Sequence, residues 1–364
     1  MDYTIDLLKQ EEIPAARTLM ESCFPKSYHS IFFIHPDKTL VARSEGKIVG
    51  GMNMDIAILP NKKRVGYFGW LYTDDSCRGS GIASALTLAS IEFLQKQRCT
   101  DIVSCVEGDN GSSMKVMANN GFSIMPLRRQ MQRFGLGLVK VNRMADRFFD
   151  MGYFLWHMQL PETETPVESE QRSFLTTALL NILAWIPCLS GYNLLHLLFP
   201  SLMPNCLQDW MYQKYPLILL SLPLFALAVR TLSMEISAQV QHVDVQFIGW
   251  DTAWLLGFLC PLILGIPFPV PGNVYISGYH WHNSEMDGVL CKMARSEQLF
   301  LAFFCILFRG SIALRYCFTL LLLDSLFFFY PFTGFNASRV KKRGAAAFVT
   351  PVAQVIVTAL LLFL

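Results

Sequence analysis

Leu71-Tyr-Thr-Asp-Asp-Ser-Cys-Arg-Gly-Ser-Gly-Ile-Ala83 is the stretch of sequence that decides the fold of the first half of this chain. Residues 65–73 are rich in aromatic and β-branched side chains, which predicts a strand. Apolar residues then recur at helical spacing from Ile82 to Phe93, which predicts a helix. A glycine-containing loop at the start of a helix points several backbone N–H groups at one place, on the positive end of the helix dipole. We therefore expect the loop from Arg78 to Ala83 to bind a phosphate or a pyrophosphate.

Two common phosphate-binding loops do not fit this stretch. A Walker A loop has Lys and then Ser or Thr directly after its last glycine, whereas Ile82 and Ala83 follow Gly81 here. A dinucleotide-binding loop has a third glycine at a fixed spacing, and this chain has none at that position. The loop therefore belongs to another class of phosphate site.

The residues Arg78-Gly79-Ser80-Gly81-Ile82-Ala83 resemble the acetyl-CoA loop of the GNAT acyltransferase superfamily, whose pattern is Arg/Gln-x-x-Gly-x-Gly/Ala. A second signature of that family follows at the expected distance. It consists of a strand at 101–106, then Asp109-Asn110, a helix, and Asn120-Gly121-Phe122. The resemblance covers residues 1–160 and implies an α/β GNAT fold, in which a mixed, mostly antiparallel sheet has flanking helices.

The resemblance also implies how the site is built. Acetyl-CoA or another acyl-CoA would be the co-substrate, and an amine would attack its thioester carbonyl. A backbone N–H near Leu71 or Tyr72 would hold the acyl oxygen, and Asn110 would contact the pantetheine arm. The expected cofactor-binding residues are Leu71, Tyr72, Thr73, Arg78, Gly79, Ser80, Gly81, Ile82, Ala83 and Asn110.

The acid and base residues depart from the common family pattern. Many GNAT enzymes have a Tyr as general acid four residues before the glycine of Gly-Phe, and Met117 stands there in this chain. The central strand lacks the Glu that often acts as base and offers Tyr67 and Tyr72 instead. We expect Glu107, at the end of the next strand, to be the base, and Tyr72 to be a second catalytic residue. The alternative for Glu107 is an ordinary exposed loop carboxylate.

The other elements of the first half follow from local patterns. We expect an edge strand at 2–8, a helix at 14–23, a hairpin of strands at 40–43 and 48–59, and a late strand at 153–158. Residues 130–150 are basic and longer than a usual connection, so they form either a helix on the membrane surface or a solvated helix.

Composition and charge distinguish the two halves of the chain. The 364 residues are 52% hydrophobic and 16% charged, with a mean hydropathy of +0.35, which is typical of a membrane protein. Nearly all long apolar runs follow Ser173. The net charge of +2 argues against a nucleic-acid partner. Ten scattered cysteines without CxxC spacing, and a start without an apolar signal sequence, predict that the first half lies in the cytoplasm.

Residues 161–172 are polar and contain two prolines, which predicts a linker. Residues 173–364 are expected to form an all-α polytopic membrane domain. Prolines in the third apolar stretch disfavour a continuous helix, and clusters of basic residues favour the cytoplasmic side. We therefore expect five spans plus one re-entrant segment in a bacterial inner membrane, with Lys341 to Arg343 in the cytoplasm and Leu364 on the far side. The apolar stretches are 174–198, 215–234, 252–270, 299–330 and 345–364.

The second half resembles intramembrane site-2 metalloproteases in two short motifs. Pro271-Gly-Asn-Val-Tyr-Ile276 is similar to their Pro-Gly-Ala-Val-x-Ile stretch, and Pro331-Phe-Thr-Gly-Phe-Asn-Ala337 to their Pro-x-x-x-x-Asp-Gly motif. The expected metal ligands are absent, because Arg230-Thr-Leu-Ser-Met234 replaces His-Glu-x-x-His and Asn336 replaces the Asp. We therefore expect neither a metal nor protease activity.

Several polar residues of the second half leave alternatives open. His242 and the pair His280 and His282 are either interfacial side chains or metal ligands. Charged residues within apolar segments either form a pair that fixes helix packing or line a cavity for the acceptor. These charged residues are Arg230, Glu235 and Asp324.

Two functions are compatible with these patterns. The first is a membrane-anchored N-acyltransferase that moves an acetyl or longer acyl group from acyl-CoA to an amine, which can be a small molecule, a lipid or a peptide. The alternative is a sensor or scaffold that binds acyl-CoA with little catalysis, while its membrane domain binds a partner protein. Both include the lipid bilayer as a partner, and a homo-oligomer is compatible with either.

Overall fold

The computed structural model describes residues 2–148, 150–160, 174–185, 198, 216–264, 268, 270–278, 284–310, 313–329 and 332–363. The chain divides into two compact units. Of the described residues, the N-terminal unit contains 2–148 and 153–160, and the C-terminal unit contains 150–152 and those from 174 onward. The expected linker at 161–172 lies outside the described residues, so it stays a prediction.

A seven-stranded mixed sheet with strand order β1-β2-β3-β4-β5-β7-β6 organises the N-terminal unit. Only the β4–β5 pair is parallel, and all other neighbours are antiparallel. This is the mixed, mostly antiparallel arrangement expected from the GNAT resemblance. The strands are β1 (Thr4–Leu7), β2 (Thr39–Ser44), β3 (Lys47–Ile58), β4 (Arg64–Thr73), β5 (Asp101–Glu107), β6 (Ser123–Ile124) and β7 (Tyr153–Gln159).

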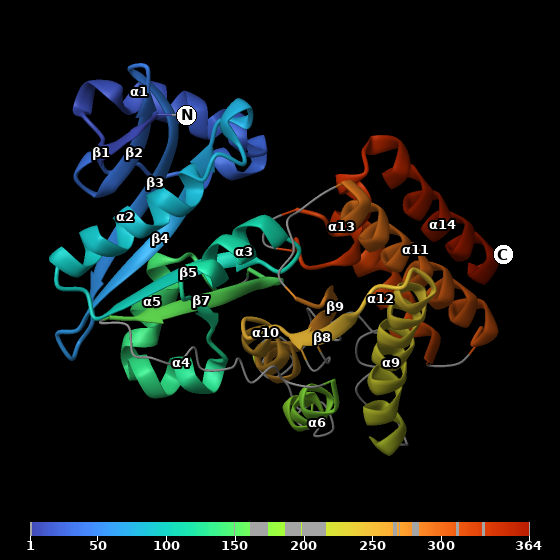
Figure 1. Ribbon diagram of the computed structural model, residues 1–364. Coiled ribbons are helices and arrows are strands. Elements are labelled where there is room, and N and C mark those ends of the chain that lie inside the picture. The colour runs from blue at the N-terminus through green and yellow to red at the C-terminus, as the bar shows by residue number, and fades with distance from the viewer. Residues whose placement is uncertain are drawn as a thin grey trace. The chain divides into compact units, whose positions relative to one another are not determined.

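Two helices cover opposite faces of the sheet. Helix α2 (Ile82–Lys96) is close enough to β3 and β4 that a Cβ on Gly66 would lie 2.4 Å from Leu94 Cδ1. Helix α1 (Ile13–Cys23) packs on the other face, where Asn53 Nδ2 lies 3.3 Å from Met20 Sδ. Figure 1 shows α2 lying along β3 and β4. Because Gly66 has no side chain, α2 can pack closely against the sheet. This packing holds the loop that precedes α2 next to the end of β4.

The basic segment after β6 differs from the single helix expected at 130–150. The structure has α4 (Leu127–Phe134), a 3-10 turn at Gly135–Gly137 and α5 (Leu138–Met144). Gly135 ends α4 with a φ of +52°, which a residue with a side chain rarely adopts, so one continuous helix cannot form. Both helices bury apolar residues against β3, β4, β5 and β7. The buried cluster contains Ala57, Leu59, Val65, Tyr67, Val103, Met125, Phe134, Val141, Ala145 and Leu155.

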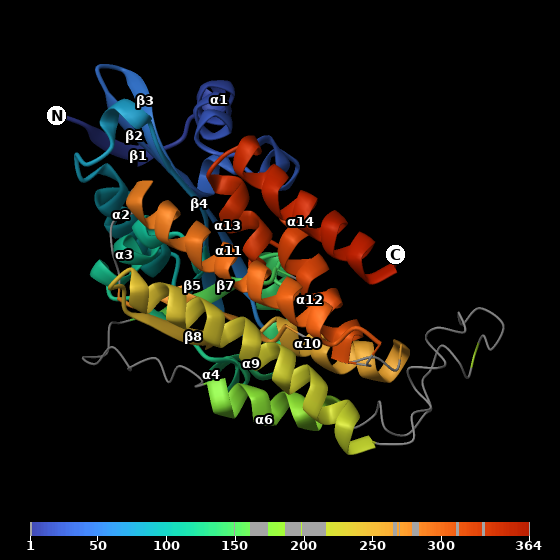
Figure 2. The ribbon, with the colours of Figure 1, turned by 90° about the vertical axis from the view of Figure 1, so that its right-hand side faces the viewer.

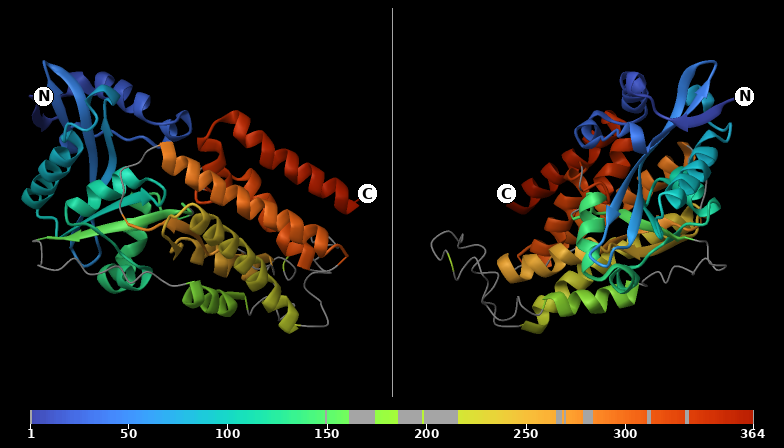
Figure 3. Two further views of the ribbon diagram at one scale, coloured as in Figure 1. Left: turned by 45° about the vertical axis from the view of Figure 1, so that its right-hand side comes forward. Right: turned by 90° about the vertical axis from the view of Figure 1, so that its left-hand side faces the viewer.

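The C-terminal unit is mostly helical. Helix α11 (Ser284–Leu307) contacts four other helices, and Figures 2 and 3 show it beside the long helices α9 and α14. The other helices are α6 (Phe174–Trp185), α9 (Pro216–Val240), α10 (Ala253–Leu259), α12 (Ala313–Leu326), α13 (Asn336–Lys342) and α14 (Ala345–Phe363), with a π-helical turn at Cys260–Leu264.

The expectation of an all-α second half is wrong in one respect. Strands β8 (Val245–Gly249) and β9 (Gly272–Ile276) form a two-stranded antiparallel sheet. Each strand has only five residues, and its local pattern does not predict a strand. The strand forms because it pairs with a segment far away in the sequence. The sheet shares a core with α9 and α11, formed by Met234, Ala238, Phe247, Val274, Leu290 and Met293.

One helix of the described residues is long and apolar enough to cross a bilayer, namely α14 over Ala345–Leu362. The fourth apolar stretch is divided between two helices, because α11 ends at Leu307 and α12 begins at Ala313. In the third stretch, α10 gives way to a π-helical turn that contains Pro261. The number of spans and the re-entrant segment stay predictions.

Candidate active site

The two central strands diverge at the point where the site is expected. The β4–β5 ladder pairs Val65 with Asp101 and ends with Phe68 opposite Ser104. Both strands continue past that pair, β4 to Thr73 and β5 to Glu107. Figure 1 shows them separating, with β4 rising beside β3 while β5 runs beside β7. The backbone groups beyond the split therefore face an opening inside the sheet instead of a neighbouring strand.

The loop after β4 has the geometry of an anion site. Gly79 and Gly81 have φ values of +79° and +83°, and Gly81 is the N-cap of α2. A Cβ built on either glycine would meet no atom within 4 Å, so the space in front of the loop is open. The amides of Ile82 and Ala83 have no acceptor within the helix, as at every helix N-terminus. These donors and the helix dipole converge on open space, which suits a pyrophosphate.

Arg78 adds an exposed positive charge to the loop. Its Nη2 lies 2.6 Å from Asp75 Oδ1, and its side chain is 63% exposed. An exposed pair of this kind contributes little to stability, so the guanidinium can exchange the carboxylate for a phosphate. Ser80 is held by its own loop, since its Oγ donates to the Cys77 carbonyl. The structure thus brings Arg78 to Ala83 together as expected, without testing what they bind.

A bulge in β4 determines on which face of the sheet the side chains just before the loop lie. The register with β3 pairs Asn53 with Trp70 and Met54 with Phe68, so Gly69 is one extra residue on β4. A bulge of this kind exchanges the two faces of a strand. Beyond it, Trp70 and Tyr72 face the end of α1 and the loop that follows it, where Trp70 contacts the ring of Phe24. The sequence analysis did not predict this bulge.

The predicted catalytic Tyr72 has a buried side chain. It is 2% exposed, and its hydroxyl has no hydrogen-bond partner among the described residues. A Cβ on Gly51 would lie 2.4 Å from the Tyr72 hydroxyl, which explains the glycine opposite it. Burial raises the pKa of Tyr72, and the nearby Cys23 thiol adds to the effect. The phenol therefore stays protonated, which disfavours a base and leaves the role of acid as a prediction.

Asn110 is the N-cap residue of α3 (Gly111–Asn119), which follows the end of β5, and Met117 lies within this helix. The Asn110 side-chain oxygen caps the helix by accepting from the Ser113 N–H at 3.1 Å, so its amide nitrogen remains the group that can donate to a ligand. Met117 is buried in the core, and the Phe122 N–H donates to its carbonyl. The position of the usual acid thus serves packing in this chain.

Glu107, the predicted base, ends β5 beside aromatic residues from distant parts of the chain. It lies opposite Tyr153 in the β5–β7 ladder, and the Tyr153 and Tyr28 hydroxyls are 3.0 Å apart. The Tyr28 ring also contacts Trp70, with centroids 6.2 Å apart. The sequence analysis missed Tyr28, Trp70 and Tyr153 because only the fold brings them together. The one available signal was their aromatic character, since Trp70 and Tyr153 lie within predicted strands and Tyr28 in the connection between predicted elements.

The comparison with protein families decides what this site belongs to. The model of the acetyltransferase (GNAT) family matches residues 5–122. These residues form a GNAT acetyltransferase domain. The match contains the strand, the glycine loop and the Asn-Gly-Phe signature, so the expected GNAT enzyme that uses acyl-CoA is confirmed at the level of the domain.

Solved structures similar to the chain include the following three. One is the NatC complex bound to Gag peptide and CoA, with 21% identity over 44% of this chain and 99% of the other, and a TM-score of 0.35. Another is ribosomal-protein-alanine N-acetyltransferase from Brucella melitensis, with 14% identity over 43% and 99%, and a TM-score of 0.32. The third is N-acetylglutamate synthase from Neisseria gonorrhoeae, with 10% identity over 44% and 35%, and a TM-score of 0.33. No curated protein matches the chain. The domain assignment rests on the family match, since these likenesses are weak.

A second polar site lies in the core of the C-terminal unit. Arg230 on α9 forms two bonds to Asp324 on α12, at 2.6 and 3.0 Å, and donates a third to the Gly272 carbonyl at 3.0 Å. Asp324 Oδ1 also accepts from the Asn336 N–H at 2.9 Å. Both charged side chains are fully buried. Of the two roles left open for Arg230 and Asp324, the structure shows an interhelical pair.

The positions that would hold a metal in the protease resemblance meet at this same cluster. Asn336 Nδ2 lies 3.3 Å from Met234 Sδ, and Asn273 Nδ2 donates to Asn336 Oδ1 at 3.1 Å. Arg339 also donates to Asn336 Oδ1, at 3.2 Å. Among the residues that the structure describes, no group of three or more His, Cys, Asp or Glu could hold a metal ion. His280 and His282 lie outside those residues.

Proposed function

We propose that this protein transfers an acetyl group, or a longer acyl group, from acyl-CoA to an amine that is presented at a membrane. The observation that supports this most is the loop between β4 and α2, in which two left-handed glycines leave the helix N-terminus open. The divergence of β4 and β5 next to that loop supplies a passage of the right kind for the pantetheine arm. A Cβ on Gly79 or Gly81 would clash with no neighbouring atom, so close packing does not explain these two glycines.

The proposed reaction is a direct acyl transfer. The amine nitrogen attacks the thioester carbonyl, its C–N bond forms as the C–S bond breaks, and coenzyme A leaves as a thiolate. A backbone N–H near Leu71 or Tyr72 stabilises the oxyanion, and the amine loses its proton to Glu107 or to water. The leaving thiolate is protonated by solvent or by Tyr72. Positioning of the two substrates supplies much of the rate.

We place the amine acceptor at the end of the sheet where Tyr28, Trp70, Glu107 and Tyr153 gather. A carboxylate among aromatic rings attracts an ammonium group before it is deprotonated. The two tyrosine hydroxyls can orient an acceptor by hydrogen bonds, since each can donate and accept. A small amine, a lipid headgroup or a peptide N-terminus all fit this chemistry.

The membrane part of the proposal rests on α14 and on the apolar composition of the second half. We propose that α14 spans a bilayer and that the C-terminal unit is an inactive relative of a site-2 protease. Support for the relationship comes from Arg230, Met234 and Asn336, which stand where metal ligands would be. Asn336 contacts Met234, and Asp324 accepts from both Arg230 and the Asn336 N–H. The five-span topology, the inner membrane and a homo-oligomer remain part of this proposal.

The alternative, an acyl-CoA sensor or scaffold, is favoured by one observation. Met117 is buried where many relatives have a catalytic Tyr. Such a protein would bind acyl-CoA through the same loop and release little free coenzyme A. The loop itself is common to both functions, so turnover is the property that separates them.

The test uses the purified full chain in lipid nanodiscs. Isothermal titration with acetyl-CoA measures binding, and chromatography of released coenzyme A measures turnover with peptides, amino acids, polyamines and phosphatidylethanolamine. Binding with amine-dependent release supports the transferase. Binding without release on every acceptor supports the sensor. An absence of heat and of protection from thermal unfolding would contradict both.

A further inference from the structure

One face of the N-terminal unit combines exposed apolar and basic side chains outside the site described above. Leu136 and Val139 are 90% and 64% exposed, and Lys140 and Arg143 are also exposed. Positions 136, 139, 140 and 143 follow helical spacing, so they lie on one side of the short turn and α5. The opposite side is in the core, where Val141 packs in the cluster behind α4 and α5.

The β3–β4 hairpin extends this face. Lys140 Nζ donates to the Ile58 carbonyl at 2.8 Å, and Ile58 is itself 50% exposed. Leu59 lies so close to Gly137 that a Cβ there would be 3.0 Å from Leu59 Cδ1. The exposed Lys62 follows in the same tight turn, where its N–H donates to the Leu59 carbonyl. We call Ile58, Lys62, Leu136, Val139, Lys140 and Arg143 the basic–apolar face.

The charge around this face is mainly positive. Between residues 127 and 148 there are six basic residues and one acidic residue, Asp146. Arg133 is committed to Asp101, and Arg147 is buried, so neither contributes to the surface. The remaining basic residues point to a polyanionic partner. Exposed Leu and Val among them have no favourable contact to make with a polyanion in water, whereas they gain by entering hydrocarbon.

We propose that the basic–apolar face docks on an anionic lipid bilayer, with Leu136 and Val139 entering the boundary between headgroups and acyl chains and Lys140 and Arg143 contacting lipid phosphates. The two parts reinforce each other, because apolar insertion alone is weak for two side chains and a basic cluster alone does not select a bilayer over other polyanions. This docking concerns the surface alone and does not depend on the acyl-transfer reaction.

The experiment is hydrogen exchange of the full chain in nanodiscs. One set contains phosphatidylcholine alone, and the other contains phosphatidylcholine mixed with phosphatidylglycerol. We expect amides of residues 135–146 to exchange roughly tenfold more slowly in the anionic discs, because basic residues near such a surface gain on the order of fivefold each in binding. Salt at ~1 M shortens the Debye length to ~3 Å and should reduce the difference.

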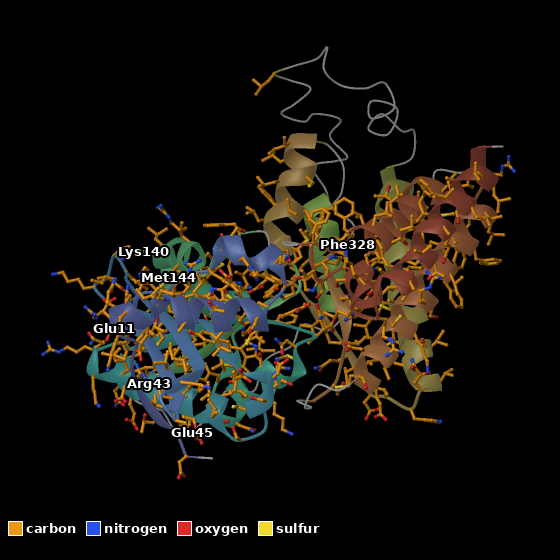
Figure 4. The ribbon with its side chains drawn as sticks, turned by 90° about the horizontal axis from the view of Figure 1, so that it is seen from above. Glu11, Arg43, Glu45, Lys140, Met144 and Phe328 are labelled. Atoms are coloured by element: carbon orange, nitrogen blue, oxygen red, sulfur yellow. The ribbon has the colours of Figure 1, made fainter. Side chains whose placement is uncertain are left out.

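Two variants and a matched control keep the outcome specific. Lys140→Glu with Arg143→Glu, and separately Leu136→Asp, should each remove the protection. Lys26→Glu with Lys47→Glu makes the same change of charge at exposed positions elsewhere and should leave it intact. Figure 4 shows that Glu45, in the turn just before Lys47, lies well apart from Lys140.

Three results would overturn the proposal. Equal protection in neutral and anionic discs would remove the role of charge, and protection that survives both variants would remove the face. Added single-stranded DNA that protects residues 135–146 as well as the anionic discs do would point to a nucleic acid instead of a bilayer. The Leu136 side chain is almost fully exposed, so its replacement by Asp does not disturb the core.

Discussion

The two polar sites of this protein differ in how their hydrogen-bonding groups are used. At the loop between β4 and α2, backbone donors face open space, and Arg78 holds an exposed partner that it can release. In the C-terminal unit, the buried side chains of Arg230 and Asp324 bond to each other, and Asp324 also accepts from the Asn336 backbone N–H. A site that must bind a ligand keeps donors available, whereas a cluster that fixes packing satisfies its own members. The difference separates a binding role from a structural role without reference to any relative.

Breaking the buried pair should have the largest effect on stability. Arg230→Met or Asp324→Leu leaves one charge buried without its partner, which costs about 3–5 kcal/mol. The double variant removes both charges and should recover most of that loss. Thermal unfolding of the full chain in nanodiscs measures the change in stability of each variant. The affinity for acetyl-CoA is the control and should not change. Single variants as stable as the double variant would show that the pair does not fix helix packing.

Gly81→Asp should lower the affinity for acetyl-CoA by about a hundredfold or more. A carboxylate at the helix N-cap faces the bound pyrophosphate, and any side chain at a φ of +83° also strains the loop. Gly81→Asn adds a side chain of similar size without a charge, so it should lower the affinity for acetyl-CoA by less. The matched control is Gly46→Asp, where a glycine at φ +76° also has open space but lies in the β2–β3 turn. Equal calorimetric affinities for the Gly81 and Gly46 variants would mean that the cofactor binds elsewhere.

Asp101, at the other end of the β4–β5 pair, should have an intermediate effect on stability. Asp101 is buried and accepts from Arg133 Nε at 2.7 Å, with His157 Nε2 2.8 Å away. Burial alone would raise the pKa of Asp101, but the bonds from His157 and Arg133 outweigh it and lower that pKa to about 2. The pKa in the folded state is thus below the ordinary value of 3.8, so the stabilisation is complete above about pH 4. It is lost as the pH falls through 2.

Asp101→Asn should therefore cost about 2 kcal/mol at pH 7, and much less near pH 2. Native-state hydrogen exchange of β5 amides measures the difference, because those amides report opening of the sheet. Asp37→Asn, at an exposed position, is the control and should change stability by less than ~0.5 kcal/mol at any pH. A cost that stays constant from pH 7 to pH 2 would show that the carboxylate charge is not the source of the stability.

Tyr72→Phe should have the smallest effect if the phenol only packs. Its buried hydroxyl lacks a partner among the described residues, so its loss should change stability by less than ~1 kcal/mol. A role as acid would instead lower kcat about a hundredfold, with no change in the affinity for acetyl-CoA. Glu107→Gln provides the comparison, since loss of a base should lower kcat and shift its pH dependence. A large fall for Tyr72→Phe alone would make this phenol the acid and would give Glu107 a lesser part.

The sequence was most informative where structure is local. The strand, the glycines and the helix from Val65 to Lys96 are consecutive, so composition and spacing predicted all three and the loop between them. The first helix and all strands of the first half except the two-residue β6 were also predicted to within a few residues. Each follows from an alternation or a helical period that one short segment contains.

Features made by distant pairs were not predictable in this way. Tyr28 and Tyr153 meet only because β7 returns beside β5, and β8 needs β9 to become a strand. The single helix expected over 130–150 failed at Gly135, whose positive φ is a property of the folded chain. The Arg230–Asp324 pair was one of two open alternatives, since sequence shows charges in apolar segments but not which of them touch.

The parallel ladder between β4 and β5 stops after Phe68 and Ser104. This break affects how readily the protein aggregates when no cofactor is bound. Beyond that pair, the sheet has two edges in its middle, and unpaired edges are templates for wrong strand partners. An extended pantetheine arm lying between them would occupy these groups, much as an added strand would. The cofactor would then also be a folding ligand, so a chain made without acyl-CoA should aggregate more readily at the centre of its sheet than at its rim.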